Sequence, residues 1–127
     1  MEINDKIKFR EELKQRLKKF VLELIKLCQE IPYSRESDII LKQLLRSGSS
    51  VYANYRAANR ARSKAEFFSK LSIVVEEADE TEMWLDLLID SNIRNSKETI
   101  LLHHESLEIL KIMASARKNS QTKSTNQ

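Results

Sequence analysis

The feature that most limits the fold of this chain is its shortage of turn-forming residues, with one glycine and one proline among 127 residues. A sheet protein needs many tight turns, and those turns depend heavily on glycine and proline. Long helices need few turns, and Leu, Ile, Lys, Glu and Ala are abundant here. The length suits one compact domain with a core of its own. We therefore predict an all-α fold.

Apolar residues recur at helical spacing in four segments, which predicts helices over residues 5–31, 35–62, 64–90 and about 95–116. Ser63 with Glu66 has the pattern of an N-terminal capping box, and Asn95 with Glu98 is a second candidate pair. The short connections between the segments favour an antiparallel up-down four-helix bundle. We see no internal repeat and no second domain.

The spacing also predicts which residues of each helix face the core. In the first three helices the predicted inner residues are Leu13, Leu17, Phe20, Leu24, Leu27 and Ile31; Ile40, Leu44, Gly48, Val51, Tyr55 and Ala58; and Phe67, Leu71, Val74, Ala78, Thr81, Leu85 and Leu88. In the fourth helix they are Ile100 or Leu101, His104, Leu107, Leu110 or Lys111, and Ala114.

The two ends of the chain lead to expectations about domain limits and location. Residues 1–116 are predicted to form the bundle domain, and the polar, basic residues 117–127 a disordered tail. The N-terminal residues have no apolar core of signal-peptide length, and no apolar run approaches the roughly 20 residues that a membrane span needs. We therefore expect a cytoplasmic protein without a membrane partner.

Residues 46–64 contain five cationic residues and no acidic one, within a chain of net charge +3. The five are Arg46, Arg56, Arg60, Arg62 and Lys64. On a helical wheel most of them lie opposite the apolar face, with Arg62 as an outlier. Such a surface can bind the phosphates of a nucleic acid. A solvated or ion-paired face is the alternative, and the wheel does not decide between the two.

The third helix is strongly acidic, and Glu80 and Glu82 flank the inward-facing Thr81. Like charges four residues apart repel one another on a helix, so these carboxylates favour an oppositely charged partner surface, within the chain or on another copy. Plain solvation is the alternative. The residues predicted to form an interface between subunits are Gly48, Ser49, Tyr52, Glu80, Glu82 and Trp84.

The sequence contains no recognisable catalytic or metal-binding motif. There is no glycine-rich phosphate loop and no G-x-S-x-G, and neither His103 nor His104 has a glutamate three residues before it. Cys28 lies within an apolar pattern, which is typical of a small buried hydrophobic residue. We therefore predict no enzymatic activity, no metal, no cofactor and no small-molecule substrate.

Residues 41–91 resemble the signature of the four helix bundle protein family, first noticed as reading frames in intervening sequences of bacterial 23S rRNA genes. The residues that carry the resemblance are Arg46, Ser50, Val51, Asn54, Lys70, Leu71, Ile73, Glu77, Ala78, Glu80, Thr81, Trp84, Leu85 and Leu88. The chain departs from the pattern at Ala57 and Ala58, where many members have a glutamate followed by glycine.

This resemblance implies an antiparallel four-helix bundle that assembles as a homopentamer. It also implies a relation to the accessory protein of diversity-generating retroelements, a basic pentamer that binds nucleic acid and its reverse transcriptase. A ring of identical subunits is a head-to-tail arrangement, in which a basic and an acidic helix can meet. The leading hypothesis is a non-enzymatic ring that binds RNA or a nucleoprotein. The alternative is a protein–protein interaction scaffold without nucleic acid.

Overall fold

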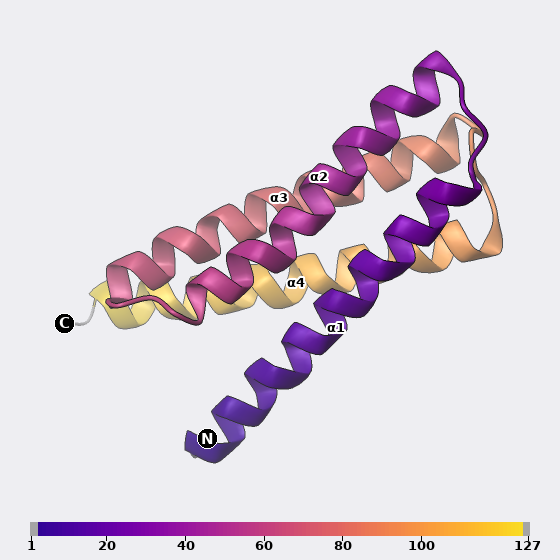
Figure 1. The fold of residues 1–127 in the computed structure, drawn as a ribbon. Helices are drawn as coiled ribbons and strands as arrows, with labels where there is room; N and C mark the ends of the chain where they lie inside the picture. Colours follow the sequence, from indigo (N-terminus) through magenta and orange to yellow (C-terminus); the bar gives the residue numbers. More distant parts are fainter. Residues whose placement is uncertain (1–2, 126–127) are drawn as a thin grey trace.

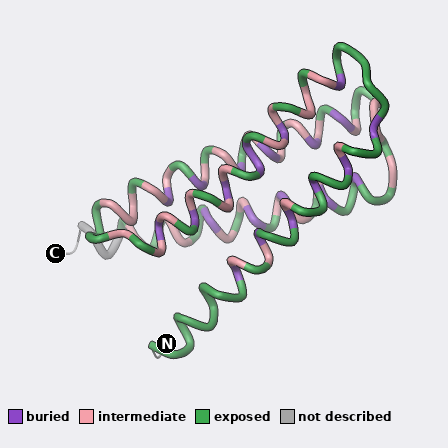
Figure 2. Tube along the Cα trace, in the orientation of Figure 1, coloured by how far each residue is buried: buried purple, intermediate pink, exposed green. Residues whose placement is uncertain are grey.

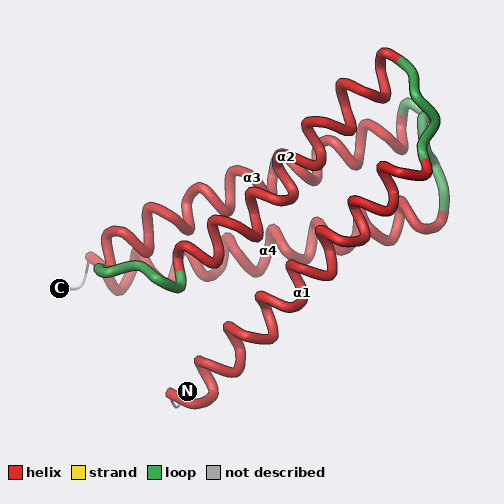
Figure 3. Tube along the Cα trace, in the orientation of Figure 1, coloured by secondary structure: helices red, strands yellow, loops and turns green. Residues whose placement is uncertain are grey.

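The structure, a computed structural model, describes residues 3–125, and every regular element within them is a helix. The helices are α1 (Ile3–Glu30), α2 (Arg35–Ala58), α3 (Lys64–Asp90) and α4 (Lys97–Thr125). The connections lie at alternate ends, so consecutive helices run antiparallel (Figures 1 and 3). The prediction of an all-α fold with four helices is confirmed.

Helix α1 is packed less completely than the other three helices. Its N-terminal half diverges from α2, α3 and α4 (Figure 1), and residues 3–12 are all exposed (Figure 2). Burial begins at Leu13 and continues to Ile31. Only Ile3, Ile7 and Phe9 are large apolar residues in the diverging part, and all three are exposed. The bundle is therefore most compact where α3 packs against α2 on one side and against α4 on the other.

The predicted inner faces of the first three helices are confirmed almost residue by residue. All six predicted residues from Leu13 to Ile31 are buried. In α2 and α3 the predicted residues are buried except Ile40 and Phe67, which are half-buried at the edge of the core. Each of these helices has one clearly apolar face, so the periodicity was sufficient to orient it.

The inner face predicted for α4 was wrong. The buried residues are Thr99, Leu102, Ser106, Ile109 and Met113, whereas the predicted His104 is exposed. Apolar residues lie on several sides of this helix, and Ile100 and Leu101 are exposed. Hydrophobic periodicity alone therefore could not select the face that packs on α3.

The helix starts are set by serine caps. Ser63 accepts a hydrogen bond from the backbone N–H of Glu66 at 3.0 Å, which confirms Ser63 as the predicted N-cap. The other half of the predicted capping box is not formed, because the Glu66 carboxylate accepts from the backbone N–H of Arg62 at 3.3 Å. At the start of α4 the prediction of Asn95 with Glu98 was wrong, because Ser96 Oγ accepts the bond from the backbone N–H of Thr99 at 3.2 Å. A serine oxygen satisfies a backbone donor that the first helical turn leaves without a partner.

Two predicted helix ends also differ from the structure. Helix α2 ends at Ala58 rather than at residue 62, and the chain then turns into α3. Helix α4 continues to Thr125, where a disordered tail was predicted from residue 117; residues 126–127 lie outside the described part. Arg117 helps to explain the longer helix, because its Nε donates to Ser72 Oγ at 2.8 Å and its guanidinium lies 4.9 Å from the Phe68 ring centroid.

Within residues 3–125, no helix offers an apolar stretch that could span a bilayer.

Cys28 is half-buried rather than fully buried, and this burial raises the pKa of its thiol. A raised pKa leaves little thiolate at neutral pH, which agrees with a packing role for this residue.

Candidate nucleic-acid interface

The five cationic residues of the basic stretch fall into two structural groups, and Arg46 stands alone in the first. Its Nη1 lies 3.0 Å from Glu77 Oε2, and its Nη2 pairs with Glu80. Its Nε donates to Gln43 Oε1 at 2.9 Å. The charge of Arg46 is therefore compensated by α3 of the same chain, which is the intrachain version of the predicted contact between the basic and acidic helices.

The Glu80 carboxylate is the centre of this contact. It accepts a hydrogen bond from Trp84 Nε1 at 3.0 Å as well as from Arg46. The Trp84 indole N–H, followed by the Arg46 guanidinium, lowers the pKa of the Glu80 carboxyl, and partial burial opposes this shift. Glu80 is thus held ionised by neighbours within its own chain.

The second group consists of Arg56, Arg60, Arg62 and Lys64, which are exposed around the turn between α2 and α3. No carboxylate among the described residues forms an ion pair with any of these four side chains. The Arg56 guanidinium lies 5.5 Å from the centroid of the Tyr52 ring, so its stem and head rest against an aromatic face. Ending α2 at Ala58 brings these cations to one end of the bundle.

An open cavity of about 430 Å³ lies beside this turn. Cationic side chains from two sides line it, Lys6 and Arg10 from α1 and Arg62 and Lys64 from the turn. The start of α3 at Ser63 also faces the cavity, and a helix N-terminus carries a partial positive charge. This end of the molecule therefore attracts anions, and the diverging half of α1 contributes to it.

The residues predicted to form an interface between subunits do not act as a group. Gly48 is buried inside the chain, where a Cβ would overlap Leu24 Cδ1 of α1. The close helix approach that Gly48 permits is therefore that of α2 to α1 within the chain. Ser49 is exposed, and its hydroxyl donates to the Arg46 carbonyl oxygen at 3.1 Å.

The sequence profile of the 23S rRNA-intervening sequence protein family matches residues 11–115. The chain belongs to this family. A similar solved structure is the crystal structure of a protein with unknown function from the S23 ribosomal protein family of Bacteroides thetaiotaomicron VPI-5482. The two chains are 35% identical with a TM-score of 0.76, over 83% of this chain and 97% of the other. The comparison with curated proteins gave no match.

Membership confirms the family resemblance and supports the four-helix fold. The family description refers to 23S rRNA intervening sequences, and the structural relative is a protein of unknown function; neither description names an enzymatic activity. The matched range begins at residue 11, so the first, diverging turns of α1 in this 23S rRNA-intervening sequence protein lie outside it.

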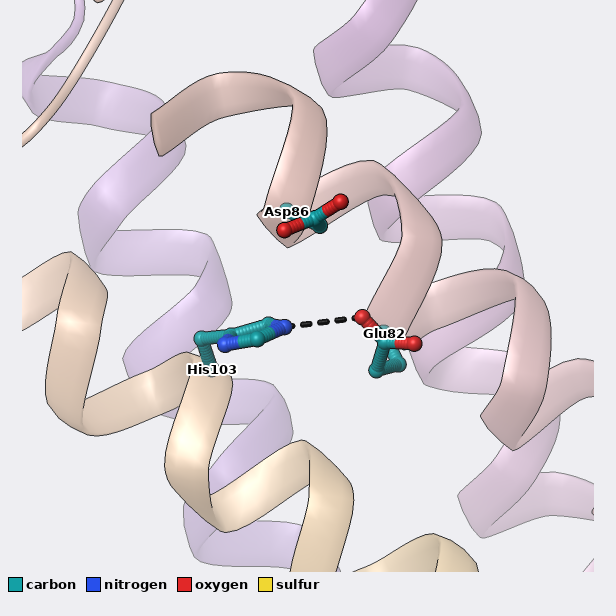
Figure 4. A group of neighbouring side chains, drawn as sticks. All are labelled: Glu82, Asp86 and His103. Atoms are coloured by element: carbon teal, nitrogen blue, oxygen red, sulfur yellow. Dashed lines mark hydrogen bonds and ion pairs between the residues drawn. The ribbon is translucent and has the colours of Figure 1, made fainter. Parts of the chain in front are cut away.

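One cluster in this family member was missed by sequence reasoning. Glu82 and Asp86 of α3 converge with His103 of α4 (Figure 4), and His103 Nε2 lies 2.8 Å from Glu82 Oε2. The Glu-x-x-His motif that identifies a metal site from sequence lies on one helix, whereas this cluster joins two helices. The spacing of Glu82 and Asp86 was the available signal, but the face of α4 that carries His103 had not been identified.

Proposed function

We propose that this protein binds RNA through the exposed cations at the turn between α2 and α3, without catalysing a reaction. The observation that carries the proposal is that Arg56, Arg60, Arg62 and Lys64 have no acidic partner among the described residues, whereas Arg46 has two. Unpaired cations attract the phosphates of a nucleic acid, and their binding releases the counterions that surround those phosphates. We refer to these four residues as the turn cations.

Features next to the turn cations favour a nucleic acid over a small anion. The cavity beside them adds Lys6 and Arg10, so the positive surface extends from the turn to α1. The half-buried Tyr52 lies beneath Arg56 and can offer part of its ring to a base. Contacts of this kind bind the phosphate backbone of the RNA and stack on its bases without distinguishing one base from another. The proposed binding therefore has little sequence specificity.

We also propose that the protein assembles as a homopentameric ring, as the family resemblance implies. Large exposed apolar residues on α1 support a contact between copies, namely Ile3, Ile7, Leu22 and Ile25. Taking about 100° per residue, these four fall in one sector of the helix, which also carries Glu11, Lys14 and Lys18 between the two apolar pairs. Exposed apolar side chains of this kind are candidate contacts with a second copy. The turn cations then remain available to RNA.

Charge reversal tests the RNA-binding proposal. The Arg56→Glu, Arg60→Glu double variant changes the net charge by the same amount as a Lys19→Glu, Lys42→Glu control. Lys19 and Lys42 are exposed and already lie near Glu23 and Asp38. We expect the first variant to lose at least tenfold in affinity for single-stranded RNA, and the control to lose much less. Equal losses would mean that net charge alone governs binding.

Light scattering on the same variants separates assembly from binding. The ring should survive both charge reversals, because none of the four substituted residues is among the exposed apolar residues of α1 that are proposed to contact a second copy. In a separate experiment, nuclease first removes any nucleic acid that is bound to the wild-type protein. If this protein then binds no added RNA but captures one protein partner, the scaffold alternative is correct instead.

A further inference from the structure

We propose that Glu82, Asp86 and His103 form a binding site for a first-row transition-metal dication such as Zn²⁺, bridging α3 and α4. Each residue offers one ligand atom, and these atoms all lie within 4.8 Å of one another. In Figure 4 the His103 ring points towards the two carboxylates, which come from successive turns of α3. Imidazole with carboxylate oxygens is a ligand set that such metals accept.

The charges around the cluster favour a cation. Glu82 and Asp86 are four residues apart on one helix, where like charges repel. Among the described residues, neither carboxylate pairs with a lysine or an arginine, and Asp86 has no hydrogen-bond or ion-pair partner. His103 faces these carboxylates, and it carries a positive charge only when it is protonated. A dication would compensate both carboxylates.

The distances are compatible with a metal after small side-chain movements. Metal–nitrogen and metal–oxygen bonds of about 2.0–2.2 Å place two ligand atoms no more than about 4.4 Å apart. The His103–Glu82 separation of 2.8 Å must widen slightly as the metal replaces the hydrogen bond. The side chains of His103 and Glu82 are 18% and 24% exposed, so an ion can enter without unfolding of the helices.

Three protein ligands leave at least one coordination position for water. A bound metal would tie the middle of α3 to α4 and stabilise the folded state by mass action. This site lies on helices α3 and α4, separate from the turn cations, so the proposal is independent of RNA binding.

Zinc titration of the tag-free protein, followed by calorimetry, tests this site. We expect Zn²⁺ to bind at least tenfold more tightly than Mg²⁺, because Mg²⁺ keeps its waters and has little affinity for imidazole. His103→Gln should weaken Zn²⁺ binding by more than about tenfold, since even the loss of an outer-shell partner costs 10–100-fold. The matched control is His104→Gln, which removes the adjacent exposed histidine and should leave the affinity unchanged.

Asp86→Asn separates metal binding from the existing hydrogen bond. Asp86 has no protein partner to lose, so this variant should fold normally, as checked by circular dichroism, and yet bind Zn²⁺ at least tenfold more weakly. The proposal is overturned if Asp86→Asn binds Zn²⁺ as well as the wild type does. It is equally overturned if the two histidine variants lose the same affinity, or if Zn²⁺ binds no more tightly than Mg²⁺.

Discussion

Arg46 of α2 forms an ion pair with Glu80 of α3, and the same carboxylate accepts a hydrogen bond from Trp84. This relationship divides the basic stretch of the sequence into one exposed arginine that pairs with carboxylates of α3 and four exposed cations that have no acidic partner among the described residues. Because of these two contacts, the ionised form of the Glu80 carboxyl group contributes to the stability of the folded protein.

The pKa of Glu80 predicts how acid affects stability. Its pKa is below the ordinary 4.5 in the folded protein, first because Trp84 donates to the carboxylate and then because Arg46 does. A lowered folded-state pKa stabilises the protein above the unfolded-state pKa, and this contribution is lost as the pH falls through the folded value. We expect Glu80→Gln to be less stable than the wild type at pH 7, and the difference to shrink below pH 4.5.

Urea unfolding between pH 7 and pH 3 measures this effect. Glu76→Gln is the control, because Glu76 is exposed on the same helix and forms no ion pair with a lysine or arginine among the described residues. A difference between Glu80→Gln and the wild type that stayed constant across this range would show that the ionisation of Glu80 does not contribute.

Gly48→Ala tests the close approach of α2 to α1. A methyl group at position 48 would overlap Leu24, which is fully buried and has little room to move. Overpacking of this kind costs about 1–3 kcal/mol, and the better helix propensity of alanine returns up to about 1 kcal/mol. We expect a net loss in the free energy of unfolding, measured by chemical denaturation.

Leu24→Ala completes a double-mutant cycle with Gly48→Ala. If the overlap is the cause, the double variant is less destabilised than the sum of the single variants, because the smaller side chain makes room for the new methyl group. Additive losses would mean that Gly48→Ala destabilises the protein by something other than overlap with Leu24.

Ser96→Ala and Asn95→Ala distinguish the structural cap of α4 from the one expected from sequence. Ser96 Oγ accepts the bond from the backbone of Thr99. Losing such a cap costs about 1 kcal/mol of stability. Asn95 is exposed, and its replacement should cost much less. Thermal unfolding of the two variants makes the comparison, and a larger loss for Asn95→Ala would contradict the structure.

How far the sequence predicts this molecule depends on the helix. The faces of α1, α2 and α3 were predictable because their apolar residues lie on one side, as with Leu13 to Ile31. The face of α4 was not, since apolar residues surround it. Which cations are paired also could not be predicted, because the contact of Arg46 with Glu80 depends on how far α2 is shifted along α3. Spacing within one helix carries no information on that shift.

The same reasoning applies to the candidate metal site. Glu82 and Asp86 share a face of α3 by spacing alone, but the position of His103 beside them follows from the orientation of α4. A site that joins two helices therefore becomes visible only after the packing of both helices is known.

The salt dependence of RNA binding tests the central claim most directly, namely that the turn cations are free and Arg46 is not. The logarithm of the affinity for single-stranded RNA should be measured against the logarithm of salt concentration for Arg56→Ala with Arg60→Ala, for Arg46→Ala and for the wild type. Each lost phosphate contact reduces the slope by about 0.7. We predict a slope about 1.4 units shallower for the double variant and an unchanged slope for Arg46→Ala. Equal slopes for the double variant and the wild type would contradict the account.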